Sequence, residues 1–342
     1  MDSAEPQQIL SPITESALFL TLTVDRQALD AVRDVLANVS GLKRSVGFRA
    51  PEAELTCVVG VGSDVWDGLF GAPRPAGLHP FHELRGVRHT APATPGDLLF
   101  HIRAHRLDLC FELAQLLVER LRAHARVVDE VHGFRSFDER DLLGFVDGTE
   151  NPEGAAARAS VLIGADDAPF AGGSYVVVQK YVHDLEVWNA LSVEQQEQVF
   201  GRTKLDDVEF ADELKAPNSH LVLNTIVDES GEQHQIMRFN MPFGRVGDGE
   251  FGTYFIGYVA AVDVIEEMLE NMFIGKPPGN SDRVLDFSTA VTGNLFFVAT
   301  AAFLDDPPSP AAPAAAALDT PGGESETNGR SLGIGSLKGR AP

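Results

Sequence analysis

The chain has 342 residues, 44% of them hydrophobic, which is enough for one large packed core or two smaller ones. Its 50 acidic residues outnumber 27 lysines and arginines, and the net charge of −23 argues against a nucleic-acid partner and favours cations. No run approaches the ~20 apolar residues of a membrane span, and the polar N-terminus lacks the pattern of a secretory signal, so we expect a cytoplasmic protein without a membrane partner.

Cys57 and Cys110 are the only cysteines, and each lies in an apolar run. This pattern favours buried free thiols in a reducing compartment over a disulfide framework. No Cys-x-x-Cys-His motif occurs, which excludes a covalently attached c-type haem, and two cysteines are too few for cysteine-rich zinc or iron–sulfur sites.

The first half of the chain predicts alternating strands and helices. Strands are expected where β-prone apolar residues cluster, and helices where leucines and valines recur every three or four positions. In chain order the predictions are strand 17–24, helix 29–39, strand 55–61, strand 97–105, helix 108–124 and strand 126–137.

The second half predicts a similar layout. The Asp-Glu-Ser-Gly turn at residues 228–231 indicates a hairpin between two of its strands. In chain order the predictions are strand 173–183, helix 185–200, strand 220–227, strand 233–241, strand 251–260, helix 262–272 and strand 294–302.

Two successive strand–helix–strand–strand–helix–strand units predict an α+β fold of duplicated ferredoxin-like units, in which helices pack on antiparallel sheets. We place the first unit at residues 1–137 and the second at residues 138–304. Long insertions join the elements at residues 70–96, 138–172 and 201–218, and loops of that length in a compact domain tend to be functional.

The composition changes from about residue 305. Residues 305–330 are rich in Pro, Ala and Gly and lack the apolar content of a core, which predicts a disordered linker. Residues 331–342 then regain Leu332, Ile334 and Leu337, spaced by small residues. This pattern favours a short recognition peptide on a flexible tether over a frayed terminus.

The most informative motif is GFVDGTENP at residues 144–152. Its glycines, Gly144 and Gly148, permit positive φ angles and close backbone approach, and Pro152 prevents a helix from continuing. Asp147, between the glycines, is therefore placed on a bend from which a carboxylate can point into a cavity. A plain surface turn is the alternative, since Asp-Gly is a common turn dipeptide.

A second candidate group lies in the predicted strand 233–241. Alternation along a strand puts Arg238 and Asn240 on one face and the core-like Met237, Phe239 and Met241 on the other. An exposed face would explain the arginine, but the flanking apolar sequence favours a buried strand. There, an arginine needs an anionic partner or a ligand.

His220 opens the predicted strand 220–227 and is one of ten histidines. Taken alone, it is a weak candidate for a metal ligand, because most histidines at strand starts are turn or surface residues. A single axial histidine is nevertheless all that a b-type haem requires of the protein.

Together these motifs resemble those of the dye-decolourising peroxidases, a family of b-type haem proteins, and most of all its bacterial B-type subgroup. The resemblance covers about residues 14–303 and implies the duplicated ferredoxin-like fold, peroxidase activity and one haem b per chain. The matching segments are residues 144–152, Ser219-His220, RFNMPFG at 238–244 and SDRVLDF at 281–287.

The resemblance implies that His220 is the axial ligand of the haem iron and donates to a carboxylate. Asp282 is the first choice for that carboxylate and Asp286 the second. Arg202, in the segment GRTK, is expected to meet a haem propionate. The motif residues also expected to bind the cofactor are Thr149, Glu150 and Asn151.

The same resemblance makes Asp147, Arg238 and Asn240 the catalytic residues. Asp147 is expected to move a proton or to order the water that does so, and Arg238 to stabilise developing negative charge. Asn240 would hold water or peroxide in place. Many relatives have an acidic residue where Phe239 stands, but Phe239 is expected to point away from the haem. An ionised aspartate predicts better activity below pH 7.

The expected substrates are H2O2 and a broad range of small-molecule reductants, including dyes and phenolics. The acidic surface favours Mn²⁺ or cationic dyes over anionic ones. The family also implies a homo-oligomer, from dimer to hexamer. Electrons are expected to reach the haem through aromatic side chains that the sequence does not rank: Trp66, Trp188, Tyr175, Tyr181, Tyr254 and Tyr258.

The segment SLGIGSLKG at residues 331–339 resembles the cargo-loading peptide that directs such peroxidases into encapsulin nanocompartments. The resemblance implies an encapsulin shell protein as partner and a location inside an encapsulin nanocompartment in the cytoplasm. Leu332, Ile334 and Leu337 would fill apolar pockets on the inner wall of the shell. Multivalent loading from an oligomer would strengthen weak single contacts.

Two other functions stay open from the sequence. One is removal of iron from haem, and the other is a haem-carrying cargo protein without catalysis. Recovery of metal-free porphyrin from the holoprotein would favour the first, and loss of rapid oxidation by peroxide in Arg238→Leu would separate the peroxidase from the second.

Overall fold

The computed structural model describes residues 5–71, 73–148 and 150–310, and every structural statement below concerns these residues. Within them, no helix is both long enough and apolar enough to cross a membrane. They belong to one compact unit that ends at Pro310. The predicted targeting residues Leu332, Ile334 and Leu337, and the predicted linker beyond Pro310, lie outside the described residues.

The first half forms a four-stranded antiparallel unit with helices against it. Its elements are β1 (Ser16–Val24), α1 (Leu29–Ala37), α2 (Val39–Gly47), β2 (Thr56–Gly62), α3 (Ser63–Phe70), β3 (Leu84–Arg85), β4 (Thr90–Ala91), β5 (Leu98–Ala104), α4 (Leu107–Leu121) and β6 (Ala125–Phe134). The main strands lie in the order β2–β5–β1–β6. Along β1, Leu18 and Phe19 enter two different hydrophobic cores because successive side chains point to opposite faces.

The second half repeats this arrangement. Its elements are α5 (Gly154–Val161), β7 (Ser174–His183), α6 (Leu185–Asn189), α7 (Val193–Phe200), α8 (His220–Asn224), β8 (Ile226–Val227), β9 (Gln233–His234), β10 (Met237–Arg238), β11 (Met241–Arg245), β12 (Glu250–Val259), α9 (Val262–Phe273), β13 (Ser288–Ala290), β14 (Asn294–Val298) and α10 (Ala301–Asp305). Its strands lie in the order β10–β12–β7–β14. The spatial order of the four strands is the same in both halves: the last strand of the half lies beside its first, followed by its third and its second. The predicted duplicated ferredoxin-like fold is therefore confirmed.

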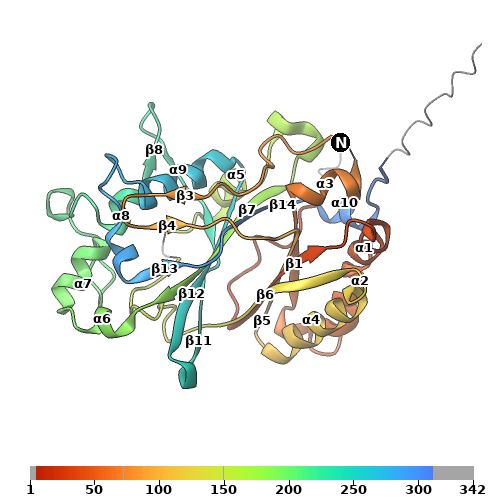
Figure 1. The fold of residues 1–342 in the computed structure, drawn as a ribbon, viewed down its shortest axis with the longest axis horizontal. Coiled ribbons are helices and arrows are strands. Elements are labelled where there is room, and N and C mark those ends of the chain that lie inside the picture. Colours follow the sequence, from red (N-terminus) through yellow and green to blue (C-terminus); the bar gives the residue numbers. More distant parts are fainter. Residues whose placement is uncertain (1–4, 72, 149, 311–342) are drawn as a thin grey trace, which may run out of the picture. The chain divides into compact units, whose positions relative to one another are not determined.

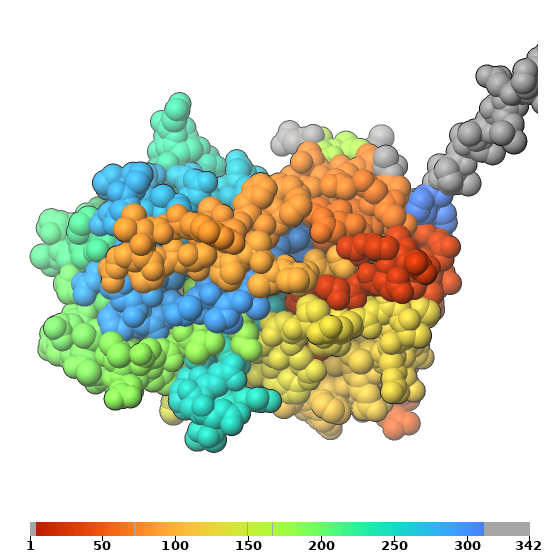
Figure 2. Space-filling model, in the orientation of Figure 1, coloured from red at the N-terminus to blue at the C-terminus, as the bar shows by residue number. Residues whose placement is uncertain are grey.

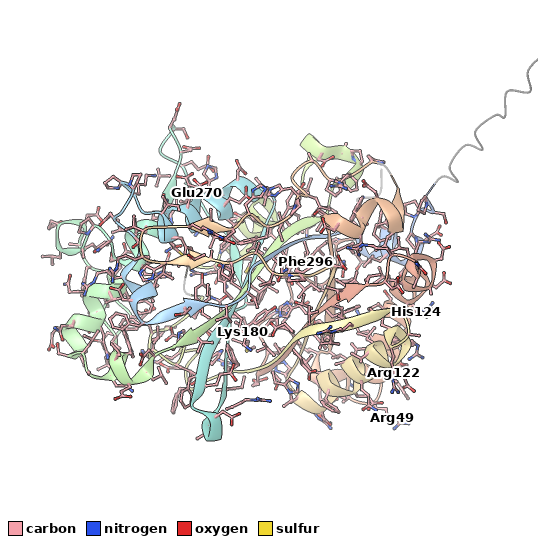
Figure 3. All side chains as sticks on the ribbon, viewed as in Figure 1. Arg49, Arg122, His124, Lys180, Glu270 and Phe296 are labelled. Carbon is pink, nitrogen blue, oxygen red and sulfur yellow. The ribbon has the colours of Figure 1, made fainter. Side chains whose placement is uncertain are left out.

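The two halves share one sheet, because β14 of the second half pairs with β2 of the first. Phe296 lies at this junction (Figure 3), and a Cβ on Gly60 would come within 2.8 Å of its Cβ. The sheet also curves, since Phe19 of β1 stacks on Tyr254 of β12 at 4.2 Å between ring centroids. The division of the chain at residue 137 stays a prediction.

Most helices of the two halves lie at opposite ends of this sheet, but α10 of the second half packs against α1 and α2 of the first. In Figure 1, α1 to α4 lie on the right and α6 to α9 on the left. The segment 71–96, which contains β3 and β4, leaves the first half and crosses the second. Figure 2 shows it as an orange band lying across the blue surface of residues near the C-terminal end of the second half.

Most predicted elements are confirmed within a few residues, including the hairpin between β8 and β9. The predicted helix 29–39 is confirmed as α1, and α2, which follows it after Asn38, was not predicted. The predicted helix 185–200 is interrupted, since it divides into α6 and α7 where Ser192 forms a capping box with Gln195. The last predicted strand ends at Val298, because Thr300 caps α10.

Two predicted strands are wrong. Residues 220–227 begin with the helical turn α8, in which the side chain of Asn224 donates to the carbonyl of His220 at 2.8 Å. Residues 233–241 divide into β9, β10 and the start of β11. The second break has a local cause, because Oδ1 of Asn240 accepts from the backbone N–H of Ile256 in β12 at 3.0 Å and so takes the place of a backbone carbonyl.

The prediction for the cysteines is confirmed. Cys57 and Cys110 are both buried and free. Burial raises the pKa of each thiol to about 12, so neither is a thiolate near neutral pH.

Candidate functional site

A cavity of about 630 Å³ lies entirely in the second half, between α8, α9, β7, β10, β12 and the loop that carries the GFVDGTENP motif. Its volume falls within the roughly 300–1,000 Å³ typical of cofactor sites. Apolar side chains from α9 supply much of one wall: Ile265, Met268, Leu269 and Met272. The predicted residues that line it are Asp147, Glu150, Arg202, His220, Arg238 and Asn240.

His220 lies at the first position of α8, where its imidazole lines the cavity. Its Nδ1 is 2.7 Å from Oδ2 of Asp282, so Nδ1–H donates to that carboxylate. Asn224, one helical turn later, donates to the same Oδ2 at 3.3 Å. Nε2 of His220 makes no hydrogen bond within the described residues, which leaves its lone pair available toward the cavity.

Asp282 is completely buried and its position is fixed from several sides. Its Oδ1 accepts from the backbone N–H of Val284 at 2.9 Å, and its own N–H donates to the carbonyl of Met272 in α9 at 2.9 Å. Asp286, the second choice for the histidine's partner, instead pairs with Arg88 at 2.6 Å and with His89 at 3.1 Å.

Two aromatic rings connect this histidine with the motif loop. Phe145, in the motif, stacks on Phe200 at 3.9 Å between ring centroids. Phe200 in turn meets the ring of His220 edge-on at 5.6 Å. The motif and the histidine are thus held by the same group of packed rings, although 75 positions separate Phe145 and His220 in the sequence (220 − 145).

Arg238 enters the cavity from β10, and its backbone is held by the motif. The side chain of Asn151 accepts from the N–H of Arg238 at 2.9 Å and donates to the carbonyl of Arg238 at 2.8 Å. Nε of the Arg238 guanidinium is buried and has no hydrogen-bond partner within the described residues, and the side chain has no ion pair there. A permanently charged donor group is therefore available to an anionic ligand.

Asp147 lies on the predicted bend, where Gly144 and Gly148 have φ angles of +93° and +85°. Its Oδ2 accepts from Nδ2 of Asn240 at 2.8 Å. Because Oδ1 of Asn240 is bonded to Ile256 of β12, the Asn240 amide links the aspartate to the sheet. Oδ1 of Asp147 has no hydrogen-bond partner in the described part of the chain.

Asp141 is a second carboxyl group beside Asp147, and the sequence did not single it out. It lines the same cavity and accepts from the backbone N–H of Phe145 at 3.0 Å. Desolvation, together with the smaller effect of the nearby charge of Asp147, raises the pKa of Asp141 to about 7. The Asp141 carboxyl is thus close to titration at neutral pH.

Arg202 is buried and pairs with two carboxylates, Glu150 at 2.9 Å and Asp207 at 3.1 Å. Glu150 lines the cavity with it, whereas the Asn151 amide is engaged by the backbone of Arg238. Thr149, also predicted to bind the cofactor, lies outside the described residues.

All six predicted electron-transfer aromatics are buried, at 8% exposure or less, and they are all the tyrosines and tryptophans of the chain. Of these, Tyr181 lines the cavity, and its hydroxyl donates to Gln179 at 2.8 Å. No tyrosine or tryptophan ring is therefore available on the surface as an oxidation site. Phe239 packs away from the cavity against Arg103, as expected.

These residues fit a b-type haem. The site offers one imidazole with a free Nε2, and its other nitrogen bonds to a buried carboxylate, as is usual for metal-ligating histidines. Apolar side chains of α9 suit a porphyrin face, and the cations Arg202 and Arg238 suit its propionates and an anionic distal ligand.

Two residues were missed from the sequence, Asn224 and Asp141. Asn224 lies four positions after His220, the spacing that brings side chains together on a helix, but that signal was hidden by the wrong strand prediction. Asp141 precedes the motif by three positions and carries no pattern of its own.

Comparison with known proteins agrees with this geometry. Sequence models of the Dyp-type peroxidase N-terminal and C-terminal regions match residues 6–135 and 138–303. A dye-decolorizing peroxidase of Rhodococcus erythropolis is 60% identical over 335 residues, which cover 98% of this chain and 97% of that protein.

Two solved structures resemble this chain in both sequence and fold. The encapsulated DyP-type peroxidase from Mycobacterium smegmatis has a TM-score of 0.88 and 59% identity, and the match covers 89% of this chain and 99% of that one. DyPB from Rhodococcus jostii RHA1 has a TM-score of 0.86 and 55% identity, covering 88% and 97%. Variants of that protein have been solved in complex with heme, and one in complex with manganese.

Proposed function

The chain belongs to the Dyp-type peroxidase family and is a haem-dependent peroxidase, and we propose that His220 is its axial ligand and that Asp147, Arg238 and Asn240 carry out the peroxide step. One observation supports this assignment most directly. The buried, unpartnered Nε of Arg238 and the free Nε2 of His220 belong to side chains that line the same cavity.

On the histidine side, Asp282 determines which nitrogen of His220 carries the proton. Because Asp282 accepts the Nδ1 proton of His220, Nε2 is the unprotonated nitrogen and points its lone pair away from the carboxylate. The carboxylate also makes the imidazole a stronger electron donor. Haem, when bound, supplies the iron that reduces hydrogen peroxide and then takes electrons from a donor.

On the peroxide side, one oxygen must lose a proton and the other must gain one before the O–O bond breaks. We assign the proton to Oδ1 of Asp147, since Oδ2 is already bonded to Asn240. Asn240 fixes the direction of this carboxylate. It does so from the sheet, because its own oxygen is bonded to β12.

Arg238 stabilises the negative charge that develops on the departing oxygen. Its guanidinium stays protonated at every working pH and cannot act as a base. Its unpartnered Nε is a donor that gains a partner only when an oxygen enters the cavity. Such an interaction lowers the barrier without stabilising the resting enzyme.

The reductants we propose are small donors, including phenolic and cationic dyes and Mn²⁺. The net charge of −23 attracts cations. Because all tyrosines and tryptophans are buried, we place electron entry at the cavity, where Tyr181 is the one tyrosine or tryptophan among the described residues of the lining. The manganese complex of the R. jostii relative is consistent with a Mn²⁺ donor.

The test of the axial ligand is an absorption spectrum of the haem-reconstituted protein. Wild type should show the Soret band of a histidine-ligated ferric haem, which H2O2 should change rapidly. His220→Ala should lose this spectrum. His234→Ala is the matched control, since that histidine also lines the cavity but pairs with Asp228. A histidine-ligated spectrum in His220→Ala would refute the assignment.

We also propose that residues 331–342 load this peroxidase into an encapsulin shell, as a homo-oligomer of two to six chains. The M. smegmatis relative is encapsulated. Replacing Leu332, Ile334 and Leu337 together by serine should abolish co-purification with the shell protein and leave peroxidase turnover unchanged. Co-purification at the wild-type level would refute the role of these three side chains.

A further inference from the structure

A second group of possible ligands lies outside the haem cavity, where the segment 71–96 crosses α9. This segment brings His79 and His82 to Glu266, and one ligand atom from each lies within 4.8 Å of the others. Among the described residues, no other three His, Cys, Asp or Glu side chains gather in this way. In Figure 3, Glu270 marks the same helix one turn further along.

The backbone around the two histidines is fixed on α9 and its surroundings before any ligand binds. On one side, the N–H of Gly77 donates to the hydroxyl of Tyr175 at 2.8 Å, and a Cβ on Gly77 would come within 2.9 Å of Val262 in α9. On the other side, His89 lies 3.1 Å from Asp286. These contacts hold the segment at both ends, and the three ligand atoms between them lie within 4.8 Å of one another without a metal ion.

The hydrogen-bond partner of Nδ1 in His79 shows that this nitrogen is protonated. Nδ1 is 2.9 Å from the carbonyl oxygen of Pro80, which only accepts, so Nδ1 carries a proton. Nε2 lies 3.2 Å from Oε1 of Glu266. If the ring is neutral, its Nε2 lone pair faces a carboxylate oxygen, and a positive charge is needed between them. A proton or a metal ion can supply it.

His82 favours the metal ion. Its ring stacks on that of His79, with 4.6 Å between centroids and 13° between planes, and it makes no hydrogen bond to the described residues. A proton on Nε2 of His79 would satisfy that nitrogen and Glu266 alone. A metal ion would engage all three side chains, and it would give the exposed His82 a partner.

We propose that His79, His82 and Glu266 bind one divalent transition-metal ion of the Zn²⁺ class. Two imidazoles and a carboxylate suit Zn²⁺, Ni²⁺ and Cu²⁺ rather than Mg²⁺ or Ca²⁺. Ligands of tetrahedral Zn²⁺ are about 3.3 Å apart, given bonds of about 2.0–2.1 Å. The His79–Glu266 pair already has this spacing at 3.2 Å, and a rotation of the exposed His82 closes the third side. Water completes the fourth position.

The proposed ion would tie the segment 71–96 to the helix that walls the haem cavity. Glu266 is on the outer side of α9. Ile265, which directly precedes it, lines the cavity together with Met268 and Leu269. The outer carboxylate and the inner apolar wall belong to the same two turns. Metal binding should therefore stabilise this helix and the segment over it together.

The experiment is calorimetric titration of EDTA-treated, dialysed holoprotein with ZnCl2. We expect one stoichiometric Zn²⁺ site per chain, competed by Ni²⁺ and Cu²⁺ but not by Mg²⁺. His79→Ala, His82→Ala and Glu266→Gln should each weaken this site by about 100-fold or more, since losing even an outer-shell partner costs up to about 100-fold. Glu266→Gln is nearly isosteric, and an unchanged Soret band will show that the variant is folded.

His105→Ala is the matched control. His105 also lies between carboxylates, with Nδ1 bonded to Glu15 and Nε2 3.6 Å from Glu54, but it has no second histidine beside it. This variant should keep the Zn²⁺ site. Absence of a stoichiometric site in the wild type overturns the proposal, as does a site that survives in all three ligand variants or is lost in His105→Ala.

Discussion

The polar side chains on the two sides of the cavity differ in how fully their hydrogen bonds are made. Around His220, the carboxylate of Asp282 accepts bonds from the imidazole, from Asn224 and from the backbone, and it is completely buried. Around Arg238, Nε has no partner, and Oδ1 of Asp147 has none either within the described residues. We call His220, Asn224 and Asp282 the closed set, because the Asp282 carboxylate has all its hydrogen bonds. We call Arg238 and Asp147 the open set, because each keeps an unused donor or acceptor.

This difference indicates that one group of residues binds the haem and the other takes part in the peroxide step. A fully bonded carboxylate such as that of Asp282 keeps one geometry and has no free acceptor for a substrate, so Nε2 of His220 is the atom that this network leaves for the haem. Unused donors and acceptors in a buried place cost stability, so their presence indicates a ligand that satisfies them. Breaking the closed set should therefore change how haem is held, while breaking the open set should change the peroxide step.

The largest effect is expected from Arg238→Leu. Loss of one charge-stabilising donor should lower the rate of oxidation by H2O2 by about 10²–10³-fold, measured by stopped flow on the holoprotein. The Soret band of the resting enzyme should be unchanged, since the closed set stays intact. Arg245→Leu is the control, because Arg245 is exposed on β11 and pairs with Asp248. An unchanged rate in Arg238→Leu would contradict the role of this side chain.

The next effect should come from the closed set. Asp282→Asn removes the charge that accepts the Nδ1 proton of His220, and we expect haem affinity to fall by about 10–100-fold. The measurement is haem transfer to an excess of apomyoglobin. Asp286→Asn is the control, since Asp286 pairs with Arg88 and His89 instead. Equal losses in the two variants would show that the partner carboxylate is wrongly assigned.

The sequence predicted the sheet better than the site. β7 and β12 were predicted because long β-prone runs form central strands in almost any context. α8 was not, because its five residues are too few for a helical period, and it is held by long-range bonds such as His220–Asp282. The break at Asn240 likewise depends on a side chain that replaces a backbone acceptor, which no local pattern reveals.

Site residues could be predicted where a motif carried them. Asp147, Arg238 and His220 were identified by resemblance, and their presence around one cavity follows from the topology. Asp141 could not be found in this way, because its pKa is raised by desolvation in the folded protein. Burial of all tyrosines and tryptophans was also beyond the sequence, since such residues occur in cores and on surfaces alike.

The clamp on Arg238 offers a finer test of the open set. Asn151→Ala removes both bonds to the backbone of Arg238 and should lower the peroxide rate by about tenfold, less than the roughly 100-fold that a 1 Å displacement can cost. In an Arg238→Leu background the same change should have almost no further effect on this rate. Asn151→Asp, which keeps the acceptor, should recover part of it. Additive losses in the double variant would mean that Asn151 acts elsewhere.

The smallest effect is a change in pH dependence. Because the pKa of Asp141 is raised to about 7, its carboxyl is protonated below pH 7 and ionised above. Ionisation adds a negative charge to the cavity in which Arg238 is proposed to stabilise the negative charge of the departing oxygen, so the rate should fall above pH 7 by less than about tenfold, or about 1.4 kcal/mol. Asp141→Asn should remove this decline.

Titration of Asp141 should also make the folded protein less stable as the pH rises. The folded protein keeps the Asp141 proton up to about pH 7, whereas the unfolded chain releases it near its ordinary value of 3.8, so this group lowers stability as pH rises between those values. Asp138→Asn is the control in the same loop, since pairing with Arg140 lowers the pKa of Asp138 and keeps it ionised near neutral pH. Persistence of the alkaline decline in Asp141→Asn, or its loss in Asp138→Asn, would assign the pH response to a group other than Asp141.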